Sequence, residues 1–256
     1  MDNSKGDFTM NTKKKNSAAL KSLAREALIG RYGVMAGGGA LIIAMNILST
    51  FIPEWIFPGY TVFSQIGQFL ISIVISLLVS LFSAGYTRLA LDVSRGRRPL
   101  LGDMLHPFFH HPDRFLLTYL ILVVIQVILQ IPVTIASRMY ANAFLQQTLT
   151  LDSAFSYLSF VLLCSSVSTL VYVILTLRFV MATYLLLDYD EIGGIQALKE
   201  SSRMMRGQKG RYFYVTISFF GVMALSVLTC GIGMLWVMPY METTLAFFYR
   251  DLAGEV

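Results

Sequence analysis

Two charged residues stand inside long apolar stretches of the sequence, where a charge needs a chemical reason. Arg178 comes ten residues before Asp188, and Glu242 comes eight residues before Arg250. If Asp188 and Arg250 mark a membrane surface, a rise of 1.5 Å per residue places Arg178 roughly 15 Å and Glu242 roughly 12 Å below it. An unpaired charge at such a depth is costly, so we expect these two side chains to meet as an intramembrane charge pair. The pair could lock two helices together, or it could belong to a substrate or ion site.

Two amide side chains share one face of another apolar stretch. Gln126 and Gln130 are four residues apart, which places both on the same side of a helix. We expect them to be intramembrane polar groups that hydrogen-bond between helices, and they could face the same interior as the charge pair. Small residues at 72, 76, 80 and 84 form a similar four-residue stripe, which is typical of close helix packing.

The three histidines all fall in the segment "GDMLHPFFHHPDRF", residues 102–115. His106 and His110 have the i, i+4 spacing of a metal site on a helix. However, proline follows both His106 and His111, and proline disfavours helical geometry in the residue before it. We therefore expect an interfacial loop, with no metal and no cofactor. No Walker loop, HExxH, GxGxxG or nucleophile elbow is found in the sequence, so we expect no catalytic residues and no enzyme activity.

The elements that position these residues follow from composition. Hydrophobic residues make up 55% of the chain and charged residues 14%, against about 25% charged in a typical soluble domain. Residues 32–53, 55–87, 115–137, 153–177 and 212–241 contain no charge at all. About 20 apolar residues cross a membrane as a helix, and these runs lack the alternation of barrel strands. The sequence predicts an all-α, polytopic transmembrane helical bundle of five to six spans.

We expect a flexible polar tail over residues 1–16 and a single membrane-embedded domain over 17–252. The spans are predicted near 33–52, 66–87, 115–137, 156–187, 212–230 and 233–251, the last being a shorter helix after the turn "CGIG". Amphipathic interfacial helices are predicted near 17–31 and 192–208, where basic and apolar residues fall on opposite faces. On the second helix we expect Ile195, Leu198 and Met205 to form the apolar face.

Basic residues give the orientation. The 20 Lys and Arg residues gather before the first predicted span, in alternate loops and at the end of the chain, with Arg138 and Arg178 as the exceptions. Since Lys and Arg collect on the cytoplasmic side, both termini are predicted to be cytoplasmic and the membrane to be the cell membrane. We expect anionic lipid headgroups as partners of Lys21, Arg25, Lys199, Arg203, Arg206 and Lys209, and no nucleic acid.

The last third of the chain carries a recognisable pattern. It consists of "LRFVMATYLLLDYDEIGGIQALKESSRMMRGQKGRYF" (177–213) and "GIGMLWVMPYMETTLAFFYRDL" (231–252), and "LAREALIGRYG" (23–33) accompanies it near the start. These segments resemble a bacterial family of integral membrane proteins of unknown function. That family is in turn distantly similar to the membrane domain attached to some glycerophosphodiester phosphodiesterases. The resemblance implies an envelope or lipid context and supplies no catalytic residue.

Three functions fit the sequence. The first is a non-enzymatic scaffold or accessory component of the membrane. The second is a small transporter or permease-like protein with a polar site around Arg178 and Glu242. The third is a lipid-processing membrane enzyme, which would need acids and histidines to converge on the cytoplasmic side. The sequence leaves protein partners and oligomeric state open.

Overall fold

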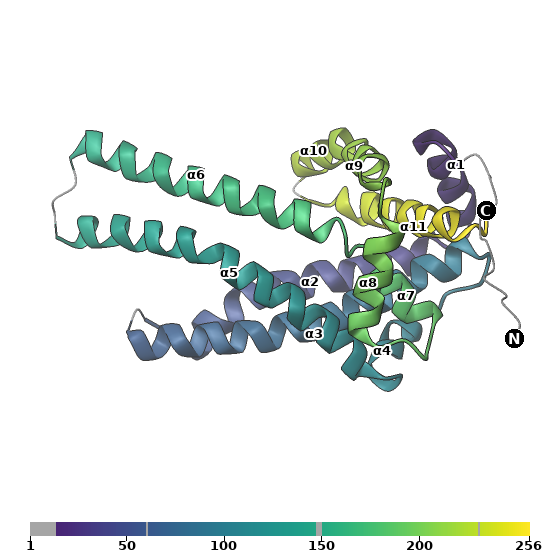
Figure 1. Ribbon diagram of the computed structural model, residues 1–256, viewed down its shortest axis with the longest axis horizontal. Coiled ribbons are helices and arrows are strands. Elements are labelled where there is room, and N and C mark those ends of the chain that lie inside the picture. The colour runs from purple at the N-terminus through teal and green to yellow at the C-terminus, as the bar shows by residue number, and fades with distance from the viewer. Residues whose placement is uncertain (1–13, 60, 147–149, 230) are drawn as a thin grey trace, which may run out of the picture. The chain divides into compact units, whose positions relative to one another are not determined.

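The computed structural model describes residues 14–59, 61–146, 150–229 and 231–256, and this part of the chain is helical without strands (Figure 1). The elements are α1 (Ser17–Leu28), α2 (Tyr32–Ile56), α3 (Val62–Ser94), the 3₁₀ helix η1 (Leu101–Leu105), α4 (His106–Phe109), α5 (Pro112–Leu145), α6 (Leu151–Thr176), α7 (Ala182–Asp188), α8 (Gly194–Met204), α9 (Lys209–Ile217), α10 (Phe220–Leu228) and α11 (Met234–Ala253). The predicted all-α fold is therefore confirmed.

Five helical segments of the described chain are long and apolar enough to cross a membrane: Tyr32–Ile56, Val62–Ser94, Pro112–Phe144, Asp152–Thr176 and Lys209–Leu228. They correspond to the first five predicted spans. The predicted sixth span, 233–251, coincides with the helix α11, which is not one of the five. The chain is thus a multi-pass membrane protein by the length and composition of its helices.

The fourth predicted span differs from the structure in one respect. We expected one helix over 156–187, but α6 ends at Thr176 and α7 begins at Ala182. The turn between them is held by Ser201 of α8, whose buried hydroxyl accepts a hydrogen bond from the Met181 amide (3.1 Å) and donates one to the Arg178 carbonyl (2.9 Å). A side chain distant in sequence thereby satisfies backbone groups that the break leaves without helical partners.

The chain forms two compact units, which are described separately. Unit 1 comprises residues 1–47, 82–106 and 210–256, and unit 2 comprises 48–81 and 107–209. The single domain predicted over 17–252 stays a prediction. Residues 14–16 of the predicted tail are not helical, and residues 1–13 lie outside the described chain.

Unit 1 is organised around α11, whose buried residues include Thr243 to Tyr249 in succession. Helix α1 packs on α11 through Leu20, Ala24 and Leu28, one residue per helical turn. The Asn16 side chain caps α1 by accepting a hydrogen bond from the Ala19 amide at 2.9 Å.

Unit 2 contains an antiparallel hairpin of α5 and α6, which run side by side (Figure 1). Pro112 begins α5, where its missing N–H is not needed, and Thr150 caps α6. At the base of the hairpin, α7 and α8 pack on each other and on α5.

Glycine is required where α3 meets η1 in unit 1. A Cβ added at Gly85 would lie 1.9 Å from the Met104 carbonyl oxygen, a backbone atom that cannot move aside without shifting η1. We predict that Gly85→Ala lowers the free energy of unfolding by about 3 kcal/mol or more, at the upper end of overpacking costs. Thermal unfolding of the purified protein in detergent measures it. Gly102→Ala in η1, whose Cβ would meet nothing within 4 Å, is the matched control. Equal melting temperatures for the two variants would contradict the packing described here.

Candidate functional site

The described residues of unit 2 form an open groove between the first part of α3 and the middle of α5. It has a volume of about 510 Å³ and we call it the α3–α5 groove. Its lining is Phe69, Ser72, Ile73 and Ser76 from α3 with Val123, Gln126, Val127, Gln130, Ile131, Thr134 and Ile135 from α5. The structure thus brings the first two residues of the predicted small-residue stripe, Ser72 and Ser76, together with the two predicted polar residues.

The hydroxyl groups in this groove are already hydrogen-bonded within their own helices. Ser72 donates to the Gln68 carbonyl (2.6 Å), Ser76 to the Ile73 carbonyl (2.8 Å) and Thr134 to the Gln130 carbonyl (3.0 Å). The side-chain amides of Gln126 and Gln130, in contrast, have no hydrogen-bond partner among the described residues. The groove therefore offers two free carboxamides on a largely apolar surface.

A polar contact joins the two helices beyond one end of the groove. The Arg138 guanidinium of α5 donates a hydrogen bond to the Gln65 side-chain carbonyl of α3. A second hollow of about 790 Å³ continues from Thr134 past Arg138 to Phe144. The two helices are thus joined at Arg138 and leave space between them at Gln126.

The two predicted intramembrane charges fall in different units. Arg178 belongs to unit 2, where it is exposed and lies two residues beyond the candidate span Asp152–Thr176. Glu242 lies on α11 in unit 1. The predicted pair therefore stays a prediction.

Within unit 1, Glu242 lies among tyrosines. Its electrostatic neighbours there are the hydroxyl groups of Tyr86 on α3 and Tyr212 on α9, and no described residue of this unit forms an ion pair with it. The Tyr86 side chain is 2% exposed and its hydroxyl has no hydrogen-bond partner in the described structure. A carboxyl group in such surroundings can take up and release a proton, as polar residues along proton pathways do.

The predicted headgroup contacts of α1 divide into two cases. Lys21 is bound to the protein, since its ammonium donates to the Ser218 carbonyl at 3.0 Å and lies 4.1 Å from the centre of the Phe219 ring. Burial, with a smaller effect from Arg25, lowers the pKa of Lys21 below its ordinary value. Arg25 is exposed and remains available to a lipid headgroup.

The helix α8 is amphipathic, but its buried face differs from the predicted one. We expected Ile195, Leu198 and Met205 to form an apolar face. Leu198 and Met205 are buried, whereas Ile195 is 52% exposed and Gly194, Ala197 and Ser201 complete the buried face. These small residues let α8 pack against protein instead of lying on lipid with that face.

The cationic side chains of α8 and its C-terminal end lie mostly in the open. Lys199, Arg203 and Arg206 are exposed, and Lys209 is half-buried. Arg203 forms an exposed ion pair with Glu200 at 3.0 Å. Contact of these cations with anionic headgroups stays a prediction.

Sequence reasoning missed a buried arginine at the base of unit 2. Arg114 is 8% exposed, and its guanidinium donates to the carbonyls of Tyr189 (3.0 Å), Asp190 (2.6 Å) and Ile192 (3.2 Å). It thereby satisfies three carbonyls of the loop between α7 and α8. Its position at the end of a predicted span gave no signal that the loop would fold over it.

A second arginine that the sequence did not single out connects three parts of unit 1. Arg211 donates to an Asp251 carboxylate oxygen at 2.5 Å and to the Lys15 carbonyl, while the Lys15 amide donates to the other Asp251 oxygen at 3.1 Å. The Arg211 guanidinium also lies 4.7 Å from the centre of the Phe248 ring. This cluster fixes the start of α1, α9 and α11 to one another.

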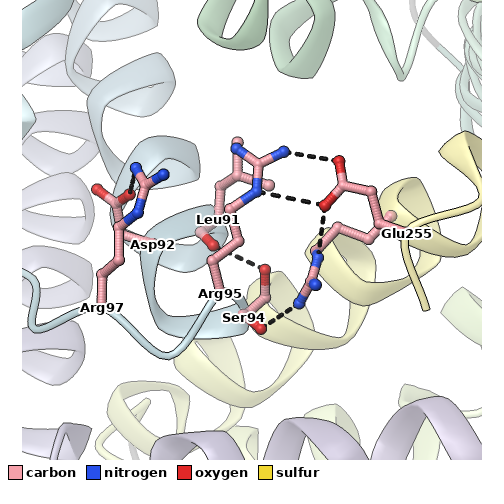
Figure 2. Close-up of polar contacts among 7 residues, drawn as sticks. Leu91, Asp92, Ser94, Arg95, Arg97 and Glu255 are labelled. Carbon is pink, nitrogen blue, oxygen red and sulfur yellow. Dashed lines mark hydrogen bonds and ion pairs between the residues drawn. The ribbon is translucent and has the colours of Figure 1, made fainter.

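The C-terminal residues of unit 1 carry a third charge cluster, shown in Figure 2. Glu255 accepts hydrogen bonds from Arg95 at 2.8 Å and from Arg250 at 2.9 Å, and Arg250 also donates to the Ser94 carbonyl. Arg97 pairs with Asp92 beside it at 3.1 Å. The contacts join the end of α3 to the end of α11.

The helical fold and the five candidate spans define a polytopic, all-α integral membrane protein. Residues 10–255 match the family described as "Protein of unknown function (DUF975)", so the chain belongs to that family. No curated protein and no solved structure matches the chain. The resemblance to a family of unknown function is confirmed, whereas nothing in the comparisons shows the similarity to glycerophosphodiester phosphodiesterases.

The Glu255 cluster predicts a dependence of stability on pH. Burial alone would raise the pKa of the Glu255 carboxyl, but the hydrogen bonds and charges of Arg95 and Arg250 outweigh it and lower that pKa. A carboxyl with a lowered pKa stabilises the fold above its ordinary pKa and ceases to do so as pH falls through its folded value. We predict that the melting temperature of the wild type exceeds that of Glu255→Gln at pH 7, and that the two converge below pH ~4. A difference that stays constant over this range would contradict the cluster.

Proposed function

We propose that this protein is a non-enzymatic accessory component of a bacterial cell membrane that acts as a scaffold by lateral association within the bilayer. The observation that carries the proposal is the α3–α5 groove, in which two free amides lie on an open, apolar surface. Hydrocarbon cannot satisfy an amide, whereas a protein helix can. A polar group in such a groove therefore favours a protein neighbour over lipid tails.

The spans of unit 2 leave much of their apolar surface uncovered, which supports the same function. On α6, Leu162, Leu163 and Leu170 are each about 60% exposed. In the candidate windows of α3, α5 and α6, only 6% of the residues are buried. Such helices have room for further helices beside them, as an assembly partner requires.

The cationic residues support the proposed orientation. The exposed Lys199, Arg203 and Arg206 on α8, together with Arg25 on α1, fit contact with anionic headgroups of the cytoplasmic leaflet. Both termini are then cytoplasmic. A lipid-rich envelope context also agrees with the expected likeness to the membrane domain of some glycerophosphodiester phosphodiesterases.

Site-specific photocrosslinking in intact cells tests the scaffold function. We predict that a photoreactive residue at Gln130, inside the groove, gives a protein adduct of one defined mass. A photoreactive residue at Ile128 is the matched control, because it lies on the same helix at nearly the same depth, 57% exposed and outside the groove lining. The control should give lipid adducts or none. Lipid adducts alone at both positions would overturn the scaffold proposal.

A transporter remains the second candidate, and the setting of Glu242 favours it. A carboxyl group among tyrosines, with no ion pair to any described residue of its own unit, is suited to carrying a proton or a cation. In this function Arg178 would neutralise Glu242 in one state of the cycle. The transport site would then include both residues.

A flux measurement separates the two candidates. The protein is reconstituted in phosphatidylethanolamine–phosphatidylglycerol vesicles that contain a pH-sensitive dye. A transporter would acidify the vesicles under an imposed gradient, and Glu242→Gln would abolish that flux. For a scaffold we predict no flux above that of empty vesicles from either protein. A reversal of both charges, Arg178→Glu with Glu242→Arg, tests the pair itself: if the double variant is no more stable than either single variant, the two residues are not partners.

A further inference from the structure

We propose that the α3–α5 groove is occupied by a second copy of this chain, in a parallel homodimer whose Gln126 and Gln130 side chains hydrogen-bond across a two-fold axis. This inference rests on the proposed scaffold function and names its first partner. It is carried by the two free amides, by the small residues that face them and by the symmetry that a membrane imposes.

The chemistry of the carboxamide points to a self-complementary partner. A glutamine side chain has two N–H donors and one carbonyl acceptor, so two glutamines can satisfy each other. Gln126 and Gln130 leave all of these groups without partners among the described residues. Since they are four residues apart, both face the same neighbouring helix. An α5 helix from a second copy presents the same two amides at the same depth.

Symmetry allows this contact without any further element. Two copies inserted with the same orientation are related by a two-fold axis along the membrane normal, which makes their α5 helices parallel. In such a closed interface the same patch lies on both subunits. Gln126 of one copy then meets Gln126 of the other, and Gln130 meets Gln130.

The facing surface of α3 fits the approach of another helix. Ser72 and Ser76 are small, four residues apart, and have their hydroxyls bonded to α3 itself. This is the small-xxx-small arrangement that lets helices approach closely in membranes. The groove of about 510 Å³ accommodates a ridge of side chains between α3 and α5. A lipid tail could fill the same space but would leave both amides unsatisfied.

The first experiment measures dimerisation in lipid. Full-length chains fused at the N-terminus to donor or acceptor fluorescent proteins are placed in phosphatidylethanolamine–phosphatidylglycerol vesicles at increasing protein-to-lipid ratios, and energy transfer is recorded. We expect the wild type to dimerise, and the double variant Gln126→Leu with Gln130→Leu to dissociate about tenfold more readily. Leucine preserves most of the volume and suits a membrane helix, so a folded variant is expected. Ile128→Gln, which places an amide at nearly the same depth outside the groove, is the control and should not restore dimerisation in the double variant.

The second experiment locates the contact. In a chain with Cys164→Ser and Cys230→Ser, the variant Gln130→Cys should form an intermolecular disulfide on oxidation in the same vesicles, whereas Ile128→Cys should not. Equal disulfide yields at the two positions, or a wild type that stays monomeric at every ratio, would overturn the homodimer. A different protein adduct from Gln130 in cells, together with a monomer in vesicles, would overturn the homodimer and keep the scaffold function. Lipid adducts alone would reject both.

Discussion

Arginine guanidinium groups bind the backbone carbonyls of several non-helical segments in this structure, and these segments depend on them. A helix satisfies its own backbone, but the turns that join the spans leave carbonyls free, and burying a free carbonyl is costly. In unit 2, Arg114 satisfies such carbonyls by donating hydrogen bonds to three of them in the loop between α7 and α8. Arg211 and Arg250 do the same in unit 1 for the Lys15 and Ser94 carbonyls, while each also binds a carboxylate. The five donors and planar shape of the side chain explain why lysine would not serve as well.

The sequence predicted the spans because charge is excluded from hydrocarbon over a fixed length. It did not predict the break at 177–181, because the surrounding residues are as apolar as any span. The break depends on Ser201, which hydrogen-bonds to the backbone of Arg178 and Met181. Ser201 lies 20 residues beyond Met181 in the sequence, in a different helix. The same limit applies to Arg114. The position of Arg114 at the end of a predicted span identified it as a charged residue of a loop. Its carbonyl partners lie in the loop between α7 and α8, whose path the sequence around Arg114 does not specify.

The amphipathic helices show which part of a pattern carries structural information. The spacing of apolar and basic residues located α1 and α8 within a few residues. It did not say what each face contacts. On α8 the decisive residue is Gly194, where a Cβ would lie 2.7 Å from the Arg114 carbonyl oxygen. Small residues therefore mark the buried face, although hydrophobicity alone favoured Ile195. On α1, Lys21 lies against the Phe219 ring, because a long aliphatic stem lets an ammonium reach a carbonyl of its own protein.

The groove was predicted in parts and not as a whole. The glutamine pair and the serine stripe were each visible as a four-residue repeat, yet the sequence places them on separate helices without saying that these are neighbours. The polar side chains of the groove differ from those of the arginine clusters in whether they have partners within the chain. The arginines that hold the turns are bound to carbonyls or carboxylates within the chain, so their polarity is used up in folding. The side chains of Gln126 and Gln130 form no hydrogen bond within the described chain. An unbonded amide in an apolar groove destabilises the monomer. The isolated chain does not offset the free-energy cost of these unbonded amides. A molecule outside the chain offsets it when it supplies the missing hydrogen bonds.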